Sequence, residues 1–160
     1  MMQAQIVECP SCGRSLSPEM KNCPACGNAI IISSFTSVAS MPLPTINKYA
    51  NAYRNALQNN PDDKTLNNAV GMCYLKLKLY DKAIPAFEKA IEDNFDNAET
   101  FFYAAVCLLK GKKAFLAQRP EINKIENYLN AACMIEPKGV YYLFWAYIKK
   151  DDYERKFLNS

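Results

Sequence analysis

The chain has 160 residues, no histidine and only five glycines. Without histidine it lacks the most common general acid and base, and the usual activator of a serine or cysteine nucleophile. The few glycines are too scattered to form a loop that cradles phosphate groups. These absences argue against catalysis, so we expect a protein that is not an enzyme.

Long hydrophobic runs are missing as well. The longest ones, FFYAAVCLL and VYYLFWAYI, have nine residues each, whereas a helix needs roughly 20 to cross a membrane. The first residues, MMQAQIVECP, have neither the basic start nor the apolar core of a signal peptide. We therefore expect a soluble, cytoplasmic protein without membrane insertion. The net charge of +3 is too small to dictate an anionic partner.

Cysteine, in contrast, is well represented: the chain has seven, and four of them form two C-P-x-C-G phrases near its start. In a reducing compartment, such pairs bind metal more often than they form disulfides. Two C-x-x-C turns bring four thiolates around one tetrahedral ion, and this closed shell leaves no coordination position open for chemistry. We therefore predict one structural zinc ion, held by Cys9, Cys12, Cys23 and Cys26.

The stretch from residue 7 to residue 30 resembles the short zinc ribbons of many bacterial proteins. The resemblance implies a small domain over residues 1–30 whose folding free energy comes mostly from the metal. Gly13 and Gly27 are expected to turn the backbone through positive φ and to aim N–H groups at the sulfur atoms.

Two other uses of the cysteine pairs fit the sequence less well. A redox role, as in glutaredoxin-like enzymes, would use one such pair inside a βαβ domain, for which the sequence has no room. A rubredoxin-like iron site uses similar turns with a longer insert between them. Zinc is therefore the expected ion, while the choice between zinc and iron in the cell stays open.

A spacing of 34 residues recurs later in the chain, in the pairs Tyr53 and Phe87, Cys73 and Cys107, and Tyr74 and Leu108. This period, and the residues of 64–97, resemble the tetratricopeptide repeat (TPR), a pair of antiparallel helices that stacks on its neighbours. We expect the two helices to cross closely at Gly71, which has no side chain, and Phe87 to fill the space beside it. The cysteines on these helices should be buried as small hydrophobic residues.

The resemblance implies a mainly α fold: a TPR-type solenoid of about two and a half helix hairpins over residues 46–160, behind the small N-terminal zinc ribbon. Residues 31–45, rich in serine, threonine and proline, are expected to form a linker. The repeats should cover residues 64–97 and 98–137, and the second has eight extra residues between its helices. A last helix should run from 138 to 149, after which DDYERKFL should begin another.

The helices that contain FFYAAVCLL and VYYLFWAYI are apolar on every side. Stacking is expected to cover one face, through Ala105, Leu108, Leu143 and Tyr147. We expect the other face to line a groove for an apolar peptide or helix of a partner protein. The predicted groove residues are Met72, Phe102, Val106, Leu109, Tyr141 and Trp145. Two alternatives stay open: these residues meet other helices of the same domain, or the linker's isoleucines fold back into the groove.

The function that these features predict is a protein–protein interaction adaptor or scaffold, and self-association through the last helix stays open. The alternative is a nucleic-acid-associated zinc-ribbon protein that uses the ribbon and a basic loop at residues 110–124. That loop contains Lys110, Lys112, Lys113, Arg119 and Lys124, with Glu121 as its only acid. Nucleic acid is the less favoured partner because the charges within the ribbon balance one another.

Overall fold

The computed structural model describes residues 6–158 apart from residues 18 and 93. In this part of the chain, seven α-helices and one 3-10 helix follow the cysteine turns, and the β-structure consists of two isolated bridges. By its contacts the chain forms two compact units, Met1–Ala90 and Ile91–Ser160, hereafter the first and the second unit. The predicted domain boundaries at residues 30 and 45 both fall within the first unit, and they remain predictions.

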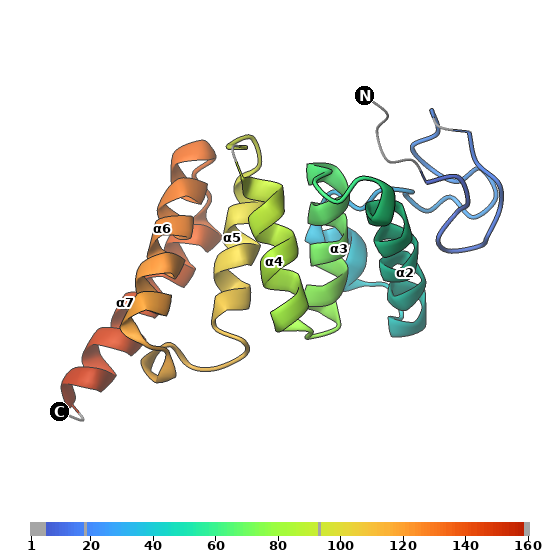
Figure 1. The fold of residues 1–160 in the computed structure, drawn as a ribbon. Helices are drawn as coiled ribbons and strands as arrows, with labels where there is room; N and C mark the ends of the chain where they lie inside the picture. The colour runs from blue at the N-terminus through green and yellow to red at the C-terminus, as the bar shows by residue number, and fades with distance from the viewer. Residues whose placement is uncertain (1–5, 18, 93, 159–160) are drawn as a thin grey trace. The chain divides into compact units, whose positions relative to one another are not determined.

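Four helices belong to the first unit: α1 (Phe35–Ala39), α2 (Leu43–Asn59), α3 (Lys64–Lys76) and α4 (Tyr80–Ile91, which ends at the boundary). At the start of α3 the Asp63 carboxylate accepts a hydrogen bond from the Leu66 N–H at 2.9 Å, which satisfies one of the free donors of the helix. α3 and α4 form the hairpin expected for residues 64–97, and α3 lies between α2 and α4 (Figure 1).

Gly71 on α3 and Phe87 on α4 lie where the two helices of this hairpin cross. A Cβ atom added at Gly71 would come within 2.8 Å of the Phe87 ring, closer than real Cβ contacts allow. The Phe87 side chain is fully buried, so it has little free space into which to move. The predicted close approach of the two helices at Gly71 is therefore confirmed.

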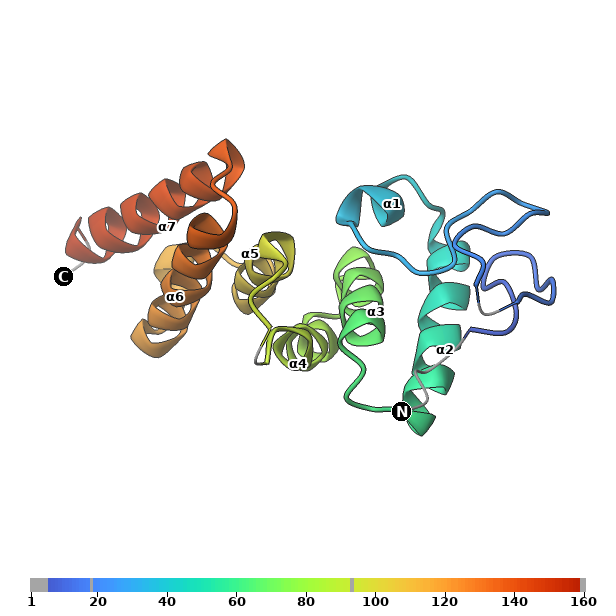
Figure 2. The same ribbon diagram turned by 90° about the horizontal axis from the view of Figure 1, so that it is seen from above.

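Residues 31–45, expected to form a linker, contribute to the core of the first unit. Ile32 and Val38 have no exposed surface, and α1 contacts α3. Figure 2 shows α1 beside α3, on the way from the cysteine turns to α2. The segment therefore packs on helices instead of forming a free tether.

The second unit contains α5 (Ala98–Leu108), the 3-10 helix η1 (Ala114–Leu116), α6 (Arg119–Ile135) and α7 (Gly139–Leu158). α5 and α6 pack together as the second helix pair. The extra residues of this repeat are taken up partly by η1 and partly by α6, which has 17 residues against 12 in α4.

α7 differs from the prediction, because DDYERKFL continues this helix instead of beginning another. The helix runs for 20 residues, and after Gly139 the sequence has no glycine or proline to interrupt it. The preceding segment also holds its second half: Asp151 accepts a hydrogen bond from the Phe115 N–H at 3.1 Å, and Asp152 pairs with Arg119 at 3.3 Å. The predicted helix end at residue 149 is wrong.

Helices dominate both units, from five residues in α1 to 20 in α7. Among the described helices, none has both the length and the apolar character that crossing a membrane requires.

Candidate functional site

Two turns of the same geometry present the four predicted metal ligands: the first knuckle, residues 8–15, and the second knuckle, residues 22–29. Each is closed by one antiparallel bridge, formed by Glu8 with Ser15 and by Asn22 with Ala29. The backbone hydrogen bond from the first cysteine also repeats, from Cys9 N–H to Arg14 and from Cys23 N–H to Asn28. The two knuckles are therefore structural copies of one another, in keeping with the repeated phrase in the sequence.

Gly13 and Gly27 each turn the chain with a positive φ, of 81° and 76°, a region that is open to glycine and strained for other residues. This part of the prediction is confirmed. Their N–H groups donate to the carbonyl oxygens of Cys9 and Cys23, at 2.9 and 2.8 Å. The glycines' own N–H groups thus close the turns on the backbone. The N–H groups that point at sulfur atoms, as expected, come from Arg14, Ala25 and Cys26.

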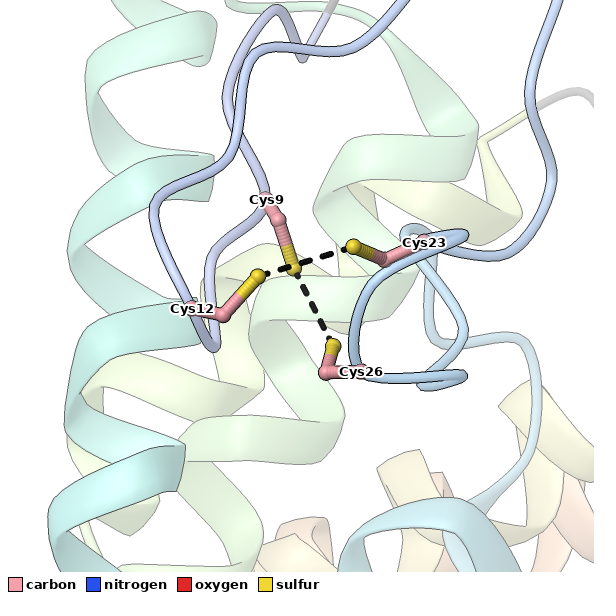
Figure 3. Close-up of side chains that lie close together, drawn as sticks. All are labelled: Cys9, Cys12, Cys23 and Cys26. Carbon is pink, nitrogen blue, oxygen red and sulfur yellow. Dashed lines mark hydrogen bonds between the residues drawn. The ribbon is translucent and has the colours of Figure 1, made fainter.

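The four cysteine sulfur atoms lie within 4.8 Å of one another (Figure 3). The closest pairs join the two knuckles, with Sγ–Sγ distances of 3.6 Å from Cys9 to Cys26 and 3.5 Å from Cys12 to Cys23. Tetrahedral zinc, with bonds of about 2.3 Å to sulfur, requires sulfur separations of about 3.8 Å. The donor set and its spacing therefore fit one tetrahedral ion.

One cysteine of each knuckle is buried and the other is exposed. Cys9 and Cys23 are buried, whereas Cys12 and Cys26 are exposed. The Asn28 side chain of the second knuckle also donates to the Ser11 hydroxyl of the first, at 3.2 Å. The knuckles thus touch through their sulfur atoms and through one side-chain hydrogen bond.

Backbone N–H groups favour a thiolate at Cys23. The hydrogen bond from the Cys26 N–H, helped by that from Ala25, lowers the pKa of the Cys23 thiol to about 6 from an ordinary 9.0. At Cys12 the N–H of Arg14 acts in the same direction, but the neighbouring thiols, that of Cys23 above all, outweigh it and raise the pKa to about 11. Backbone donors therefore favour the thiolate at Cys23 more than at Cys12, and a bound cation would favour the thiolate at both.

Two residues outside the predicted site hold the second knuckle. The Tyr49 hydroxyl donates to the Ala29 carbonyl at 2.8 Å, and the Tyr53 hydroxyl donates to the Ile30 carbonyl at 2.7 Å. Burial raises the pKa of both tyrosines, so both hydroxyls stay protonated and able to donate. The 34-residue period explains Tyr53 as a residue of the repeat alone, and in the sequence only the spacing of four residues indicates that Tyr49 and Tyr53 share a helix face.

The predicted groove residues lie in both units. Met72 of the first unit is fully buried. In the second unit, Phe102, Leu109 and Tyr141 are buried. Val106 and Trp145 are half-buried. Their role in partner binding stays a prediction.

Phe102 packs inside the second unit, with its ring centroid 4.8 Å from that of Tyr141 and 5.6 Å from that of Phe144. Contact with helices of the same domain, one of the alternatives left open, thus accounts for its burial. The Tyr141 hydroxyl and the Trp145 Nε1, however, are buried without a hydrogen-bond partner among the described residues. Because buried polar groups are rarely left unpaired, these two donors mark a place where an acceptor from a ligand would be favourable.

The outward face of α7 carries apolar side chains that we expected to be covered. Leu143 and Tyr147 are 72% and 42% exposed, so the expectation that they stack on neighbouring helices is wrong. The physical reason is the rotation of α7, which turns Tyr141 inward and the opposite side of the helix outward. On α5, Ala105 and Leu108 are buried as expected.

The basic loop at residues 110–124 extends over η1 and the start of α6. Arg119 pairs with Asp152 at 3.3 Å, and the Lys124 Nζ lies 5.9 Å from the Tyr128 ring centroid. All four lysines of the loop, Lys110, Lys112, Lys113 and Lys124, are exposed. Arg119 and Lys124 thus have partners within the second unit, which leaves less charge available for a phosphate backbone.

The remaining cysteines are buried on helices, as expected: Cys73, Cys107 and Cys133. Burial raises the pKa of the Cys73 and Cys107 thiols to about 12. At neutral pH these two side chains are therefore uncharged and pack as small hydrophobic groups.

Comparisons with known proteins agree with the helix-hairpin architecture. A family described as tetratricopeptide repeat matches residues 50–99, which include all of α3 and α4. The solved structure "MamA MSR-1 C2" is 18% identical with a TM-score of 0.57, over 69% of this chain and 60% of that chain. A mutant of MamA is 17% identical with a TM-score of 0.56, over 72% of both chains. No curated protein sequence matches the chain.

These similarities define the class of the fold. The chain is mainly α and has a TPR-like helical-repeat fold, which confirms the predicted fold class. A fold of this class supports a role in protein interaction. The chain spans 60% of the length of the first MamA structure, and identity below 20% shows the fold alone.

Proposed function

We propose that the protein is a non-catalytic, cytoplasmic adaptor that binds an apolar peptide or helix of a partner protein and carries one structural zinc ion in its N-terminal ribbon. The observation that carries the binding proposal is a pair of buried donors within a TPR-like fold, the Tyr141 hydroxyl and the Trp145 Nε1, which find no hydrogen-bond partner in the described part of the chain.

The two donors belong to one face of α7, because Tyr141 and Trp145 are four residues apart on the same helix. On α5, Phe102 packs against Tyr141, and Val106, one turn further along, is half-buried. An apolar segment placed over Val106 and Trp145 would gain hydrophobic contact there. A carbonyl oxygen of the same segment would accept the hydrogen bonds that the two donors lack.

The test is affinity capture from native cells with three forms of the protein. Trp145→Ser should lose the partner, because it removes both a donor and the apolar ring. Leu143→Ser, at an exposed position of the same helix, is the matched control and should retain the partner. Circular dichroism should show equal helical content in the three forms. Capture of the same proteins by all three forms would contradict the assignment of the groove.

A second readout uses the single tryptophan of the chain. A synthetic peptide from the captured partner should shift the fluorescence of Trp145 to shorter wavelength, because binding removes the indole from water. A peptide with its apolar residues replaced by serine should leave the spectrum unchanged. The size of the Leu143→Ser variant in solution, compared with the unsubstituted chain, reports whether the outward face of α7 supports self-association.

The zinc proposal is supported by four thiols within 4.8 Å, in two knuckles of equal geometry. Zinc accepts a closed tetrahedral shell of four thiolates and needs no further ligand. When bound, the ion would cross-link the two knuckles and would have no catalytic role. Cobalt(II), which adopts the same coordination and absorbs visible light, should bind in one equivalent and be displaced by zinc. Absence of a tetrahedral thiolate spectrum would contradict the proposed donor set.

A further inference from the structure

The second knuckle and the residues that follow it directly are attached to α2 by three hydrogen bonds. The Tyr49 hydroxyl binds the carbonyl of Ala29, the last residue of the knuckle. The Tyr53 hydroxyl binds the strap, defined as residues 30–34, which follows the knuckle directly. Since Cys23 and Cys26 are the ligands within this knuckle, these bonds connect half of the metal-binding cluster to the helical part of the first unit.

The Tyr53 hydroxyl uses its donor and an acceptor position at once. It donates to the Ile30 carbonyl at 2.7 Å and accepts a hydrogen bond from the Ile32 N–H at 3.0 Å. Tyr53 and Ile32 are fully buried. The strap can bury the Ile30 carbonyl and the Ile32 N–H because this one hydroxyl replaces the water that would otherwise bind both groups.

The first knuckle lacks an equivalent attachment among the described residues. A cavity of about 300 Å³ lies between the start of this knuckle and α2. Its lining comes from Ile6, Val7 and Glu8 on one side and from Ala52, Asn55, Ala56 and Asn59 on the other. The cysteine cluster is therefore fixed to the helices on the side of the second knuckle.

We propose that Tyr49 and Tyr53 are positioning residues for the metal centre. Through their hydrogen bonds, metal binding is thermodynamically linked to folding of the first unit. The inference rests on the proposed metal site and goes beyond a structural ion confined to a separate ribbon. Docking on α2 holds two of the four ligands in place before the ion arrives, and the bound ion in turn holds the strap against the helices. Such linkage is reciprocal. If docking on α2 increases the affinity for the metal, metal binding increases the stability of the docked form by the same free energy.

The first test measures the apparent metal affinity of the full chain by competition with a zinc chelator of known affinity. Tyr53→Phe removes only the hydroxyl, and it leaves the Ile30 carbonyl and the Ile32 N–H buried without a partner. We expect zinc affinity to fall by about tenfold or more. Tyr74→Phe is the matched control, because this tyrosine lies in the same unit and its hydroxyl interacts with Arg54. The control should bind zinc as the unsubstituted chain does.

The second test measures hydrogen exchange of the full chain with zinc bound and after chelation. Removal of zinc should speed exchange in residues 30–38 and leave α5 and α6 unchanged, because the strap loses the support of the ion. A merely structural hydrogen bond from Tyr53 would keep the strap protected with or without metal. The Tyr53→Phe variant should show fast exchange in the strap even with zinc present.

Equal zinc affinities of the unsubstituted chain and Tyr53→Phe would overturn the linkage while leaving the metal site intact. If Tyr53→Phe does not fold, Tyr49→Phe decides, since it removes only the bond to Ala29: weaker zinc binding supports the linkage and unchanged binding overturns it. An unsubstituted chain that binds no zinc would overturn the proposed metal site itself, so the two failures are distinguishable.

Discussion

The rings of Phe102 on α5 and Tyr141 on α7 lie 4.8 Å apart between centroids, with an angle of 35° between their planes. Both residues are nearly buried, and such aromatic pairs contribute about 0.5–1.5 kcal/mol beyond the burial of their area. The pair joins two helices of the second unit that a third helix separates in sequence. It also places the Tyr141 hydroxyl in the groove proposed for a partner.

We predict that Phe102→Ala lowers the free energy of unfolding of the second unit by about 3–5 kcal/mol, because it removes a buried aromatic ring. Chemical denaturation followed by circular dichroism measures the effect. Leu143→Ala, at a position 72% exposed, should change the free energy by less than about 0.5 kcal/mol. Equal losses in the two variants would contradict the packing described for Phe102.

Gly71→Ala should destabilise the first unit, because the added methyl group collides with the Phe87 ring. Overpacking costs about 1–3 kcal/mol, and the better helix propensity of alanine recovers up to about 1 kcal/mol of this. Gly139→Ala is the control, since a Cβ atom there meets nothing within 4 Å. A thermal melt in which Gly71→Ala is as stable as Gly139→Ala would show that the helices do not approach so closely.

Stability should fall as the pH rises above about 9. Burial raises the pKa of the Cys107 thiol to about 12 from 9.0, and that of the Tyr141 hydroxyl to about 12 from 10.0. The unfolded chain therefore releases these protons first, and the stability that is complete below pH 9 declines between pH 9 and pH 12. Denaturation at a series of alkaline pH values checks this. Cys107→Ala should flatten the lower part of the decline, and an unchanged profile would contradict the role of that thiol.

Nucleic acid should bind weakly and without sequence preference at physiological salt. Arg119 and Lys124 of the basic loop already have partners within the second unit, and attraction by the exposed lysines alone is screened by salt. Fluorescence anisotropy with single- and double-stranded oligonucleotides at two ionic strengths measures the effect. Tight, sequence-dependent binding at the higher salt, lost in Lys112→Ala with Lys113→Ala, would favour a nucleic-acid role instead.

The fold class was predictable because its signals lie in residue identity and spacing. The 34-residue period is the length of one helix hairpin of the repeat. The small Gly71 opposite Phe87 predicts a close crossing of two helices, and the structure contains this crossing. The four candidate ligands were predictable for a similar reason, since the two C-P-x-C-G phrases indicate both the donor atoms and the turns that present them.

The docking of the ribbon on α2 was not predictable, because its hydrogen bonds run from side chains to backbone groups. Any residue has a carbonyl and nearly any has an N–H, so the pairing of Tyr53 with Ile30 and Ile32 leaves no mark in the sequence. Isoleucines in residues 30–32 also look the same in a loose tether and in a core. Only the structure places them on α2.

The continuation of α7 past residue 149 was not predictable, because it depends on contacts with a segment far away in the sequence. In the structure, Asp151 accepts a hydrogen bond from Phe115 and Asp152 pairs with Arg119, which lets α7 continue past both. The contacts that stabilise them come from a segment more than 30 residues earlier, and spacing within a helix gives no information about it.

The metal content of the full chain tests the central claim most directly. Protein purified without added zinc should contain about one equivalent by elemental analysis. The pair Cys9→Ser with Cys23→Ser removes one ligand from each knuckle and should lose the ion, whereas Cys73→Ser with Cys107→Ser alters buried thiols outside the cluster and should retain it if the variant folds. Zinc retained after the first pair of substitutions, or a second metal such as iron in its place in the unsubstituted chain, would contradict the proposed zinc centre.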